Sequence, residues 1–224
     1  MTCVGIVGGL GVGATVHYYE RIAALCKARG VIPDIVMAHA DVELAQSFVR
    51  EGRLDKLADY FASFIERLGR AGAEMAVLPA VTAHICIAEL ASRSPLPLIN
   101  IVEATARELQ ARKLRRVALF GTTFTMEGSL WGQLTGVEIV KPQPDEIAFV
   151  GRAYQRIVDT QKGDDADTVG LRGIAAELVR RDGVEAVLLA GTDLTVIFDE
   201  DNAGFPCLDC ARVHIDAIVE KLIA

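Results

Sequence analysis

The sequence lacks three features that would each point to a particular class of protein. Its longest apolar runs are strand-length and are interrupted by glycine or polar residues, so no segment predicts a membrane span. The 224 residues carry a net charge of −7 without a block of like charges, which argues against nucleic acid or an anionic membrane as a partner. No basic region precedes an apolar stretch near the start, so we expect no secretion signal and a cytoplasmic location.

Paired cysteines are also scarce. The chain has five cysteines, an odd number, and most of them are scattered. Cys207 and Cys210 have the spacing of a metal or redox pair, but a second pair is missing and no βαβ redox pattern surrounds them. We therefore interpret the cysteines as structural thiols and predict no metal site.

Short apolar, β-branched runs alternate with longer amphipathic segments, a pattern that predicts an α/β fold with parallel strands. We expect strands at residues 4–7, 35–39, 75–79, 98–101, 116–120, 137–140, 186–189 and 205–208. We expect helices at residues 15–27, 54–70, 83–92, 102–112, 124–133, 145–161, 169–181 and 209–224.

A faint internal duplication suggests how these elements are grouped. Residues 4–8 resemble residues 117–121, and the segment around Thr82 resembles the segment around Thr192 at a similar spacing. We therefore predict two pseudo-symmetric, Rossmann-like lobes, each a parallel sheet flanked by helices, with a ligand cleft between them. The first lobe is expected at residues 1–98 plus 208–224, and the second at residues 99–207.

A glycine-rich segment, Gly8-Gly9-Leu10-Gly11-Val12-Gly13, follows the first predicted strand and opens a helix. Glycines there allow backbone N–H groups to approach an anion at a helix N-terminus, so Gly9 and Gly11 are candidates for binding a small carboxylate. The segment is not a P-loop, because no Gly-Lys-Ser/Thr follows. Two alternatives remain open: a tight turn without a ligand, and a nucleotide site in which Asp41 is the nearest acidic residue.

Three threonines, Thr82, Thr122 and Thr192, each follow a predicted strand. Ligands gather at the carboxyl ends of parallel strands, and a threonine offers a hydroxyl group and an N–H that suit a carboxylate. Helix capping is the alternative explanation for any one of them. Three threonines at corresponding turns favour the ligand.

Other candidate site residues are less distinctive. His84 has no neighbours at metal spacing, and an isolated histidine is more often structural. Arg50 and Lys162 are candidate cations for a substrate carboxylate, although each lies where it could equally be solvated. Asp209 is a candidate N-cap of the final helix, with His214 on the helix surface as the alternative to a site role.

Two strand-ending segments resemble the active-site segments of the aspartate/glutamate racemase superfamily, and of its aspartate racemase branch most closely. They are Met75-Ala76-Val77-Leu78-Pro79-Ala80-Val81-Thr82-Ala83-His84 and Ala186-Val187-Leu188-Leu189-Ala190-Gly191-Thr192-Asp193. Three further segments are similar to motifs of that branch: residues 8–19, residues 121–126 and residues 209–214, in which Cys210 and Ala211 occupy threonine positions. The resemblance extends over nearly the whole chain.

The resemblance implies two α/β lobes, a homodimer, no cofactor, and acid–base chemistry at the carbon next to a carboxylate. Family members use two thiols, one on each side of that carbon. Here Ala80 and Gly191 stand where the thiols are expected. Val81 replaces an asparagine that would help to hold the substrate carboxylate, and Asp193 replaces a glutamate. Cys86 is the thiol closest in sequence to the first position, and we expect it to point into packing.

Two-thiol racemisation is therefore disfavoured. We predict a diverged isomerase or lyase that acts on, or binds, a small carboxylic acid without a cofactor. The alternatives are a non-catalytic carboxylate-binding or regulatory protein, and a cofactor-independent amino-acid racemase. His84 and Asp193 are the predicted acid–base pair. The predicted substrate-binding residues are Gly9, Gly11, Arg50, Val81, Thr82, Thr122, Lys162 and Thr192.

Overall fold

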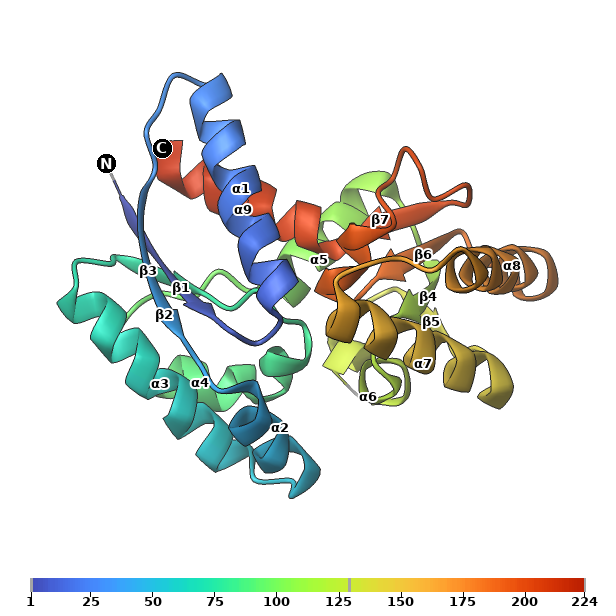
Figure 1. Cartoon of the computed structure of the whole chain (residues 1–224), viewed down its shortest axis with the longest axis horizontal. Coiled ribbons are helices and arrows are strands. Elements are labelled where there is room, and N and C mark those ends of the chain that lie inside the picture. Colours follow the sequence, from blue (N-terminus) through green and yellow to red (C-terminus); the bar gives the residue numbers. More distant parts are fainter. Residues whose placement is uncertain (1, 129, 224) are drawn as a thin grey trace. The chain divides into compact units, whose positions relative to one another are not determined.

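The computed structural model describes residues 2–128 and 130–223; Met1, Ser129 and Ala224 lie outside the described residues (Figure 1). The chain forms two compact units. Unit 1 comprises Met1–Ile101 and His214–Ala224, and unit 2 comprises Val102–Val213. The α/β class with two parallel sheets, predicted from the alternating pattern, is confirmed.

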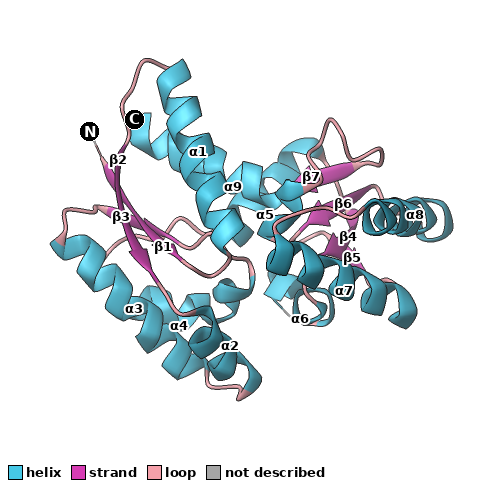
Figure 2. Ribbon diagram, viewed as in Figure 1, coloured by secondary structure: helices cyan, strands magenta, loops and turns pink. Residues whose placement is uncertain are grey.

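Unit 1 contains a three-stranded parallel sheet in the order β2-β1-β3. Its strands and most of its helices alternate along the chain, as the helices and strands drawn in Figure 2 show. Their bounds are β1 Cys3–Gly8, α1 Val12–Ala28, β2 Asp34–His39, α2 Val42–Arg50, α3 Leu54–Arg70, β3 Met75–Val77, the short 3-10 helix η1 Thr82–Cys86, and α4 Ile87–Arg93.

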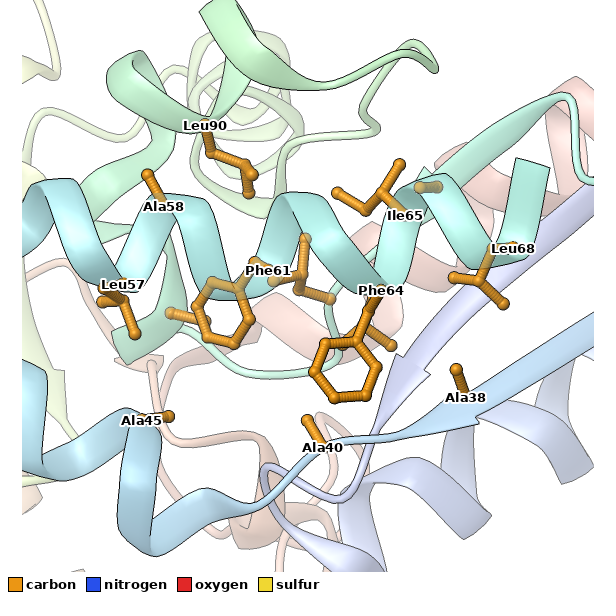
Figure 3. Packing of buried hydrophobic residues seen from close by; sticks show 14 of the residues in the cluster. Ala38, Ala40, Ala45, Leu57, Ala58, Phe61, Phe64, Ile65, Leu68 and Leu90 are labelled. Atoms are coloured by element: carbon orange, nitrogen blue, oxygen red, sulfur yellow. The ribbon is translucent and has the colours of Figure 1, made fainter. Parts of the chain in front are cut away.

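The core of unit 1 forms because β1 is covered on both faces. All six residues of β1 are buried, as expected for a central parallel strand. On one face, α3 presents an apolar stripe at helical spacing that includes Leu57, Phe61, Phe64 and Leu68. Figure 3 shows these side chains directed toward the small alanines of β2 and α2. Alanine on the facing elements leaves room for the aromatic rings of α3.

Unit 2 contains a four-stranded parallel sheet in the order β5-β4-β6-β7. The elements that follow α4 along the chain are α5 Ile101–Arg112, β4 Arg116–Phe120, α6 Thr123–Glu127, the 3-10 helix η2 Leu130–Gln133, β5 Glu138–Val140, α7 Pro144–Thr160, α8 Asp165–Asp182, β6 Ala186–Leu189, the 3-10 helix η3 Thr192–Val196, β7 Cys207–Asp209, and α9 Cys210–Ile223, most of which belongs to unit 1. Helix α5 starts at the last residue that groups with unit 1, and α9 continues from unit 2 into unit 1.

Several element predictions need correction. Residues 98–101 do not form a strand: Leu98 makes a single bridge to Ala76, and helix α5 begins at Ile101. The predicted helix at residues 83–92 begins as the 3-10 helix η1, and the predicted helix at residues 124–133 is replaced by α6 and η2. Helix α2 was not predicted.

The apolar stripe predicted for the final helix is confirmed, because its four residues are all buried: Ile215, Ile218, Val219 and Leu222. Among the helices of the described residues, none is both long enough and apolar enough to cross a membrane.

Candidate functional site

The glycine-rich turn between β1 and α1 is stabilised from within. The hydroxyl of Thr15 accepts a hydrogen bond from the Gly9 N–H at 3.2 Å and donates to the Gly11 carbonyl at 2.8 Å. Gly9 has a φ of +86°, and a Cβ there would lie 2.4 Å from the Ala40 carbonyl oxygen. Glycine is therefore required at this turn for backbone reasons. The Gly9 N–H is already bonded to Thr15, as the tight-turn alternative expects, and the carboxylate contact of Gly9 and Gly11 stays a prediction.

The turn after β3 carries Ala80, which is half-buried, and Val81, which is buried. The backbone turns sharply here, since the Ala80 N–H donates to the Leu78 carbonyl at 2.8 Å. The chain then enters η1, whose first residue is Thr82. The Ala80 carbonyl is 2.9 Å from Nδ1 of His84, one turn further on. Residue 80 therefore has a fixed backbone and a side chain that cannot ionise.

His84 is almost fully buried, and both of its ring nitrogens are hydrogen bonded. A carbonyl can only accept, so Nδ1 carries the proton and donates to Ala80. Nε2 consequently accepts from the Ile101 N–H, at a longer 3.4 Å. Burial lowers the pKa of His84 to about 4, so the ring is neutral near pH 7. The catalytic role predicted for His84 stays a prediction.

His214 lies beside His84, with the ring centroids 6.0 Å apart and the rings nearly perpendicular. The alternative that placed His214 on the helix surface is wrong, because the residue is completely buried. Its Nε2 donates to the Ile99 carbonyl at 2.8 Å, and its Nδ1 accepts from the Tyr18 hydroxyl at 3.0 Å. Burial lowers its pKa to about 3. The α9 histidine thus joins α1 to the segment before α5.

In unit 2, the turns after the neighbouring parallel strands β4 and β6 lie side by side. The Ala190 N–H donates to the Phe120 carbonyl at 2.8 Å, and a Cβ on Gly121 would lie 3.1 Å from the Ala190 carbonyl oxygen. Thr122 caps α6, since its hydroxyl oxygen accepts from the Thr125 N–H at 3.0 Å. Capping therefore accounts for Thr122, as the alternative interpretation of the turn threonines allowed.

Gly191 ends β6 and precedes η3. Its φ of −117° and ψ of 113° are extended values that any residue adopts. A Cβ at this position would nevertheless lie 2.3 Å from Cε2 of Tyr154, a residue of α7. Space, and not backbone conformation, therefore requires glycine at 191.

Asp193 is buried in η3 and is held by two side chains from the α7 region. The Tyr154 hydroxyl donates to its Oδ2 at 3.3 Å, and the Gln161 side-chain N–H donates to its Oδ1 at 3.3 Å. Burial, with the neighbouring Asp193 carboxylate adding to it, raises the pKa of Tyr154, so the phenol stays protonated. Thr192, next in the chain, is also buried.

Asp209 ends β7 and caps α9, as predicted, by accepting from the Ala211 N–H at 2.8 Å. Burial raises the pKa of this carboxyl to about 6. The neighbouring Leu189 of β6 pairs with Asp209 in register, so the carboxyl lies at the same sheet edge as the Gly191 turn.

The two predicted cations lie on the surface. Arg50 is exposed at the end of α2 and contacts Gln46 at 3.4 Å, and Lys162 is exposed between α7 and α8. Asp41, the nearest acidic residue for a nucleotide site, caps α2 by accepting from the Glu43 and Leu44 N–H groups. Its carboxylate is therefore engaged in the fold.

All five cysteines are buried free thiols, including Cys86, whose pKa burial raises to about 12. Within residues 2–128 and 130–223, no group of three or more potential ligands is arranged to hold a metal ion.

Each unit therefore assembles part of the predicted set. Unit 1 brings Gly9, Ala80 and His84 to one sheet edge, and unit 2 brings Thr122, Gly191 and Asp193 to another. The sequence did not identify Tyr154 or Gln161. They are distant from residue 191 along the chain, and no local pattern marks them.

The structure is that of a two-unit α/β protein with a parallel sheet in each unit. In such sheets the carboxyl ends of the strands are the usual place for a ligand. A family model described as Asp/Glu/Hydantoin racemase matches residues 7–218, and the chain belongs to this family.

Among curated proteins, the chain is similar to the broad specificity amino-acid racemase RacX of Bacillus subtilis (strain 168), with 21% identity over 230 residues, 99% of this chain and 98% of that protein. The crystal structure of a candidate Asp/Glu racemase from Yersinia pestis has the same fold, with a TM-score of 0.88, 23% identity and full coverage of both chains. Arylmalonate decarboxylase shares the fold more distantly, with a TM-score of 0.55 and 15% identity over 100% of this chain and 93% of that one.

Proposed function

We propose that this protein acts on a small carboxylic acid without a cofactor, as a diverged isomerase or lyase and not as a two-thiol racemase. The observation that carries the proposal is the pair of strand-end turns at Ala80 and Gly191. We equate these with the two thiol positions of the family, and neither residue has an ionisable atom. The position of Thr82 and Thr192 after the carboxyl ends of β3 and β6 supports a ligand at these turns.

Two groups are the proposed acid–base candidates. In His84 the reacting atom is Nε2, the ring nitrogen with the longer hydrogen bond. Because the ring is neutral, this nitrogen can accept a proton. In Asp193 the reacting group is the side-chain carboxylate, which hydrogen bonds from Tyr154 and Gln161 hold in place. The backbone of Gly9 and Gly11, the side chains of Thr82, Thr122 and Thr192, and the cations Arg50 and Lys162 are the proposed contacts for the substrate carboxylate, with Val81 as an apolar wall.

The fold that this chain shares with a decarboxylase supports a reaction other than racemisation. Arylmalonate decarboxylase has the same fold, so this scaffold also carries a lyase. Decarboxylation leaves an electron pair on the carbon next to the remaining carboxyl group, and a single proton donor on one face then completes the reaction. Inversion instead needs a base on one face of that carbon and an acid on the other.

A thermal-shift screen of dicarboxylates, amino acids and aromatic acids, followed by mass spectrometry of each stabilising compound, tests the proposal. We expect at least one carboxylic acid to raise the melting temperature and to be converted. His84→Ala and Asp193→Asn should then abolish conversion while circular dichroism stays unchanged. If neither variant slows conversion, neither His84 nor Asp193 takes part in the reaction.

A second candidate is a carboxylate-binding or regulatory protein without turnover. It is favoured by the hydrogen bonds of His84 and Asp193, because both groups are buried and already bonded within the fold. Stabilisation by a carboxylic acid without any new product would support it over the first candidate.

A third candidate is a cofactor-independent amino-acid racemase, which the similarity to RacX supports. Incubation with a panel of amino acids in deuterium oxide tests it directly. Absence of exchange at Cα across the panel would exclude this candidate.

The homodimer is likewise a proposal. One flank of α1 exposes Val12, Val16 and Tyr19, with exposed fractions of 59%, 49% and 51%. Their i, i+4 and i+7 spacing makes a continuous apolar stripe, which a second copy of the chain would cover. Light scattering of Val16→Glu should show a monomer if this stripe forms the dimer; an unchanged dimer would place the interface elsewhere.

A further inference from the structure

We infer that Tyr154 closes position 191 to any side chain, so that no acid–base group can occupy this position. The inference deepens the proposed function and rests on it for its chemical consequence. Its structural part stands on the packing between Gly191 and Tyr154 alone.

The steric conflict at position 191 involves the rigid part of the tyrosine. A Cβ on Gly191 would lie 2.3 Å from Cε2, 2.7 Å from Cζ and 2.9 Å from Cδ2 of Tyr154. All three atoms belong to the aromatic ring, so rotation of a flexible chain end cannot relieve the overlap. The gap is too short for any heavy-atom contact, and a thiol would need still more space.

The ring is also fixed at both ends. Tyr154 is only 7% exposed, and its neighbours on the buried face of α7, Val150, Ala153 and Ile157, are fully buried. At its far end the hydroxyl donates to Asp193, a residue that is itself 2% exposed. Displacing the ring would break this hydrogen bond and disturb the packing of α7 against the sheet edge.

The room beside Gly191 is thus filled by a group with different chemistry from a thiol. A buried phenol next to a carboxylate remains protonated, so it donates a hydrogen bond and does not remove a proton from carbon. Inversion at a carbon requires acid–base groups on both of its faces. With position 191 closed, the acid–base group left beside it is the proposed Asp193, whose carboxylate is already hydrogen bonded to Tyr154 and Gln161. We therefore expect loss of carbon dioxide from the carbon and delivery of one proton to one face, and not inversion.

A double-mutant cycle tests the structural part. Gly191→Cys and Tyr154→Ala are made singly and together, and melting temperatures are compared. We expect Gly191→Cys alone to lower the melting temperature by roughly 5–10 °C. In the Tyr154→Ala background the same change should cost little or raise the melting temperature, because the cysteine then enters the vacated space. Gly191→Ala, with a smaller side chain, covers the case in which Gly191→Cys does not fold.

Two control variants test whether the tyrosine ring causes the loss of stability in Gly191→Cys. Gly173 in α8 has open space around an added Cβ, so Gly173→Ala should be tolerated equally in both backgrounds. Tyr154→Phe keeps the ring and removes the hydroxyl, so the penalty of Gly191→Cys should persist in it. An equal cost of Gly191→Cys with Tyr154 and with alanine at 154 would overturn the inference.

The chemical part has its own readout. Wild-type protein that interconverts the enantiomers of an amino acid would contradict the one-face reaction. A failure to bind any carboxylic acid would instead defeat the proposed function and leave the coupling between positions 154 and 191 intact.

Discussion

The turns after β3 and β6 occupy corresponding places in the two units, but their surroundings differ. Ala80 keeps a small, half-buried side chain, and its carbonyl is held by His84. Gly191 has no side chain, and a tyrosine ring from α7 fills the adjacent space. A turn can therefore be without an ionisable side chain in two ways: it can carry a small side chain, or it can carry none because a residue of another element fills the space. The first route leaves the site open to reversal by one substitution, whereas the second does not.

The two units that contain these turns also differ in their buried titratable side chains. Unit 1 buries the neutral imidazoles of His84 and His214, whereas unit 2 buries the carboxyl of Asp209. Burial lowers the pKa of the histidines and raises that of the aspartate. The contributions of the two histidines and of Asp209 to stability should therefore depend on pH in opposite directions.

The largest expected effect is acid destabilisation through the histidines. The unfolded chain binds protons at His84 below about pH 6.5, but the folded ring does so only near pH 4, so stability falls as pH drops through this window. The loss is on the order of 3 kcal/mol for His84 alone. Urea unfolding at pH 7, 5.5 and 4 measures it. His84→Gln should unfold with a weaker pH dependence than wild type; an equal dependence would contradict the neutral, buried ring.

Asp209 should give an effect of opposite sign. Its folded pKa of about 6 lies above the usual value of 3.8, so its contribution to stability is present below pH 3.8 and is lost as pH rises through 6. Asp209→Asn keeps an N-cap acceptor and removes the charge. We expect it to raise the free energy of unfolding at pH 8 by about 3 kcal/mol and to change it little at pH 4. Equal effects at both pH values would show that Asp209 is not buried as a charged group.

A smaller effect is expected at the β4 turn. Thr122→Ala removes the cap of α6 and should cost about 1 kcal/mol of unfolding free energy, whereas Thr122→Ser should restore it. The affinity for a stabilising carboxylic acid, measured by calorimetry, separates the two interpretations of this residue. Unchanged affinity in Thr122→Ala indicates capping alone, and a loss of affinity that serine restores indicates a ligand contact.

The smallest effect should come from Ala80→Cys. Because Ala80 is half-buried and its backbone is held by His84, one additional sulfur atom should change stability by less than about 1 kcal/mol. Compared with Gly191→Cys, this variant measures directly how the two turns differ. Similar melting temperatures for the two cysteine variants would remove the distinction between an open and a filled position.

Hydrophobic patterning predicted much of the fold. The bounds of β4, β6 and α3 were predicted to the residue, because each combines a clear period with flanking polar or turn residues. Residues 98–101 were misassigned because a short apolar run fits a strand as well as a helix start. Helix α2 was overlooked even though Asp41 provides a recognisable N-cap before an amphipathic stretch.

The candidate site was less predictable because its decisive contacts are tertiary. The turns at Ala80 and Gly191 were located from the strands that precede them. Nothing near Gly191 in the sequence indicates that Tyr154 packs over it, and nothing near His84 indicates the Ile101 N–H on its ring. Such pairings depend on how α7 and α5 dock, which periodicity does not encode.

Helix α9 has a consequence for the order in which the protein forms during synthesis. His214 and the buried residues that follow it belong to the unit that contains β1, whereas the intervening Val102–Val213 complete the other unit. The ribosome must therefore translate all of unit 2 before the unit that contains β1 receives residues 214–223. The later-encoded unit has all of its residues first, so the usual N-to-C order of domain completion is inverted.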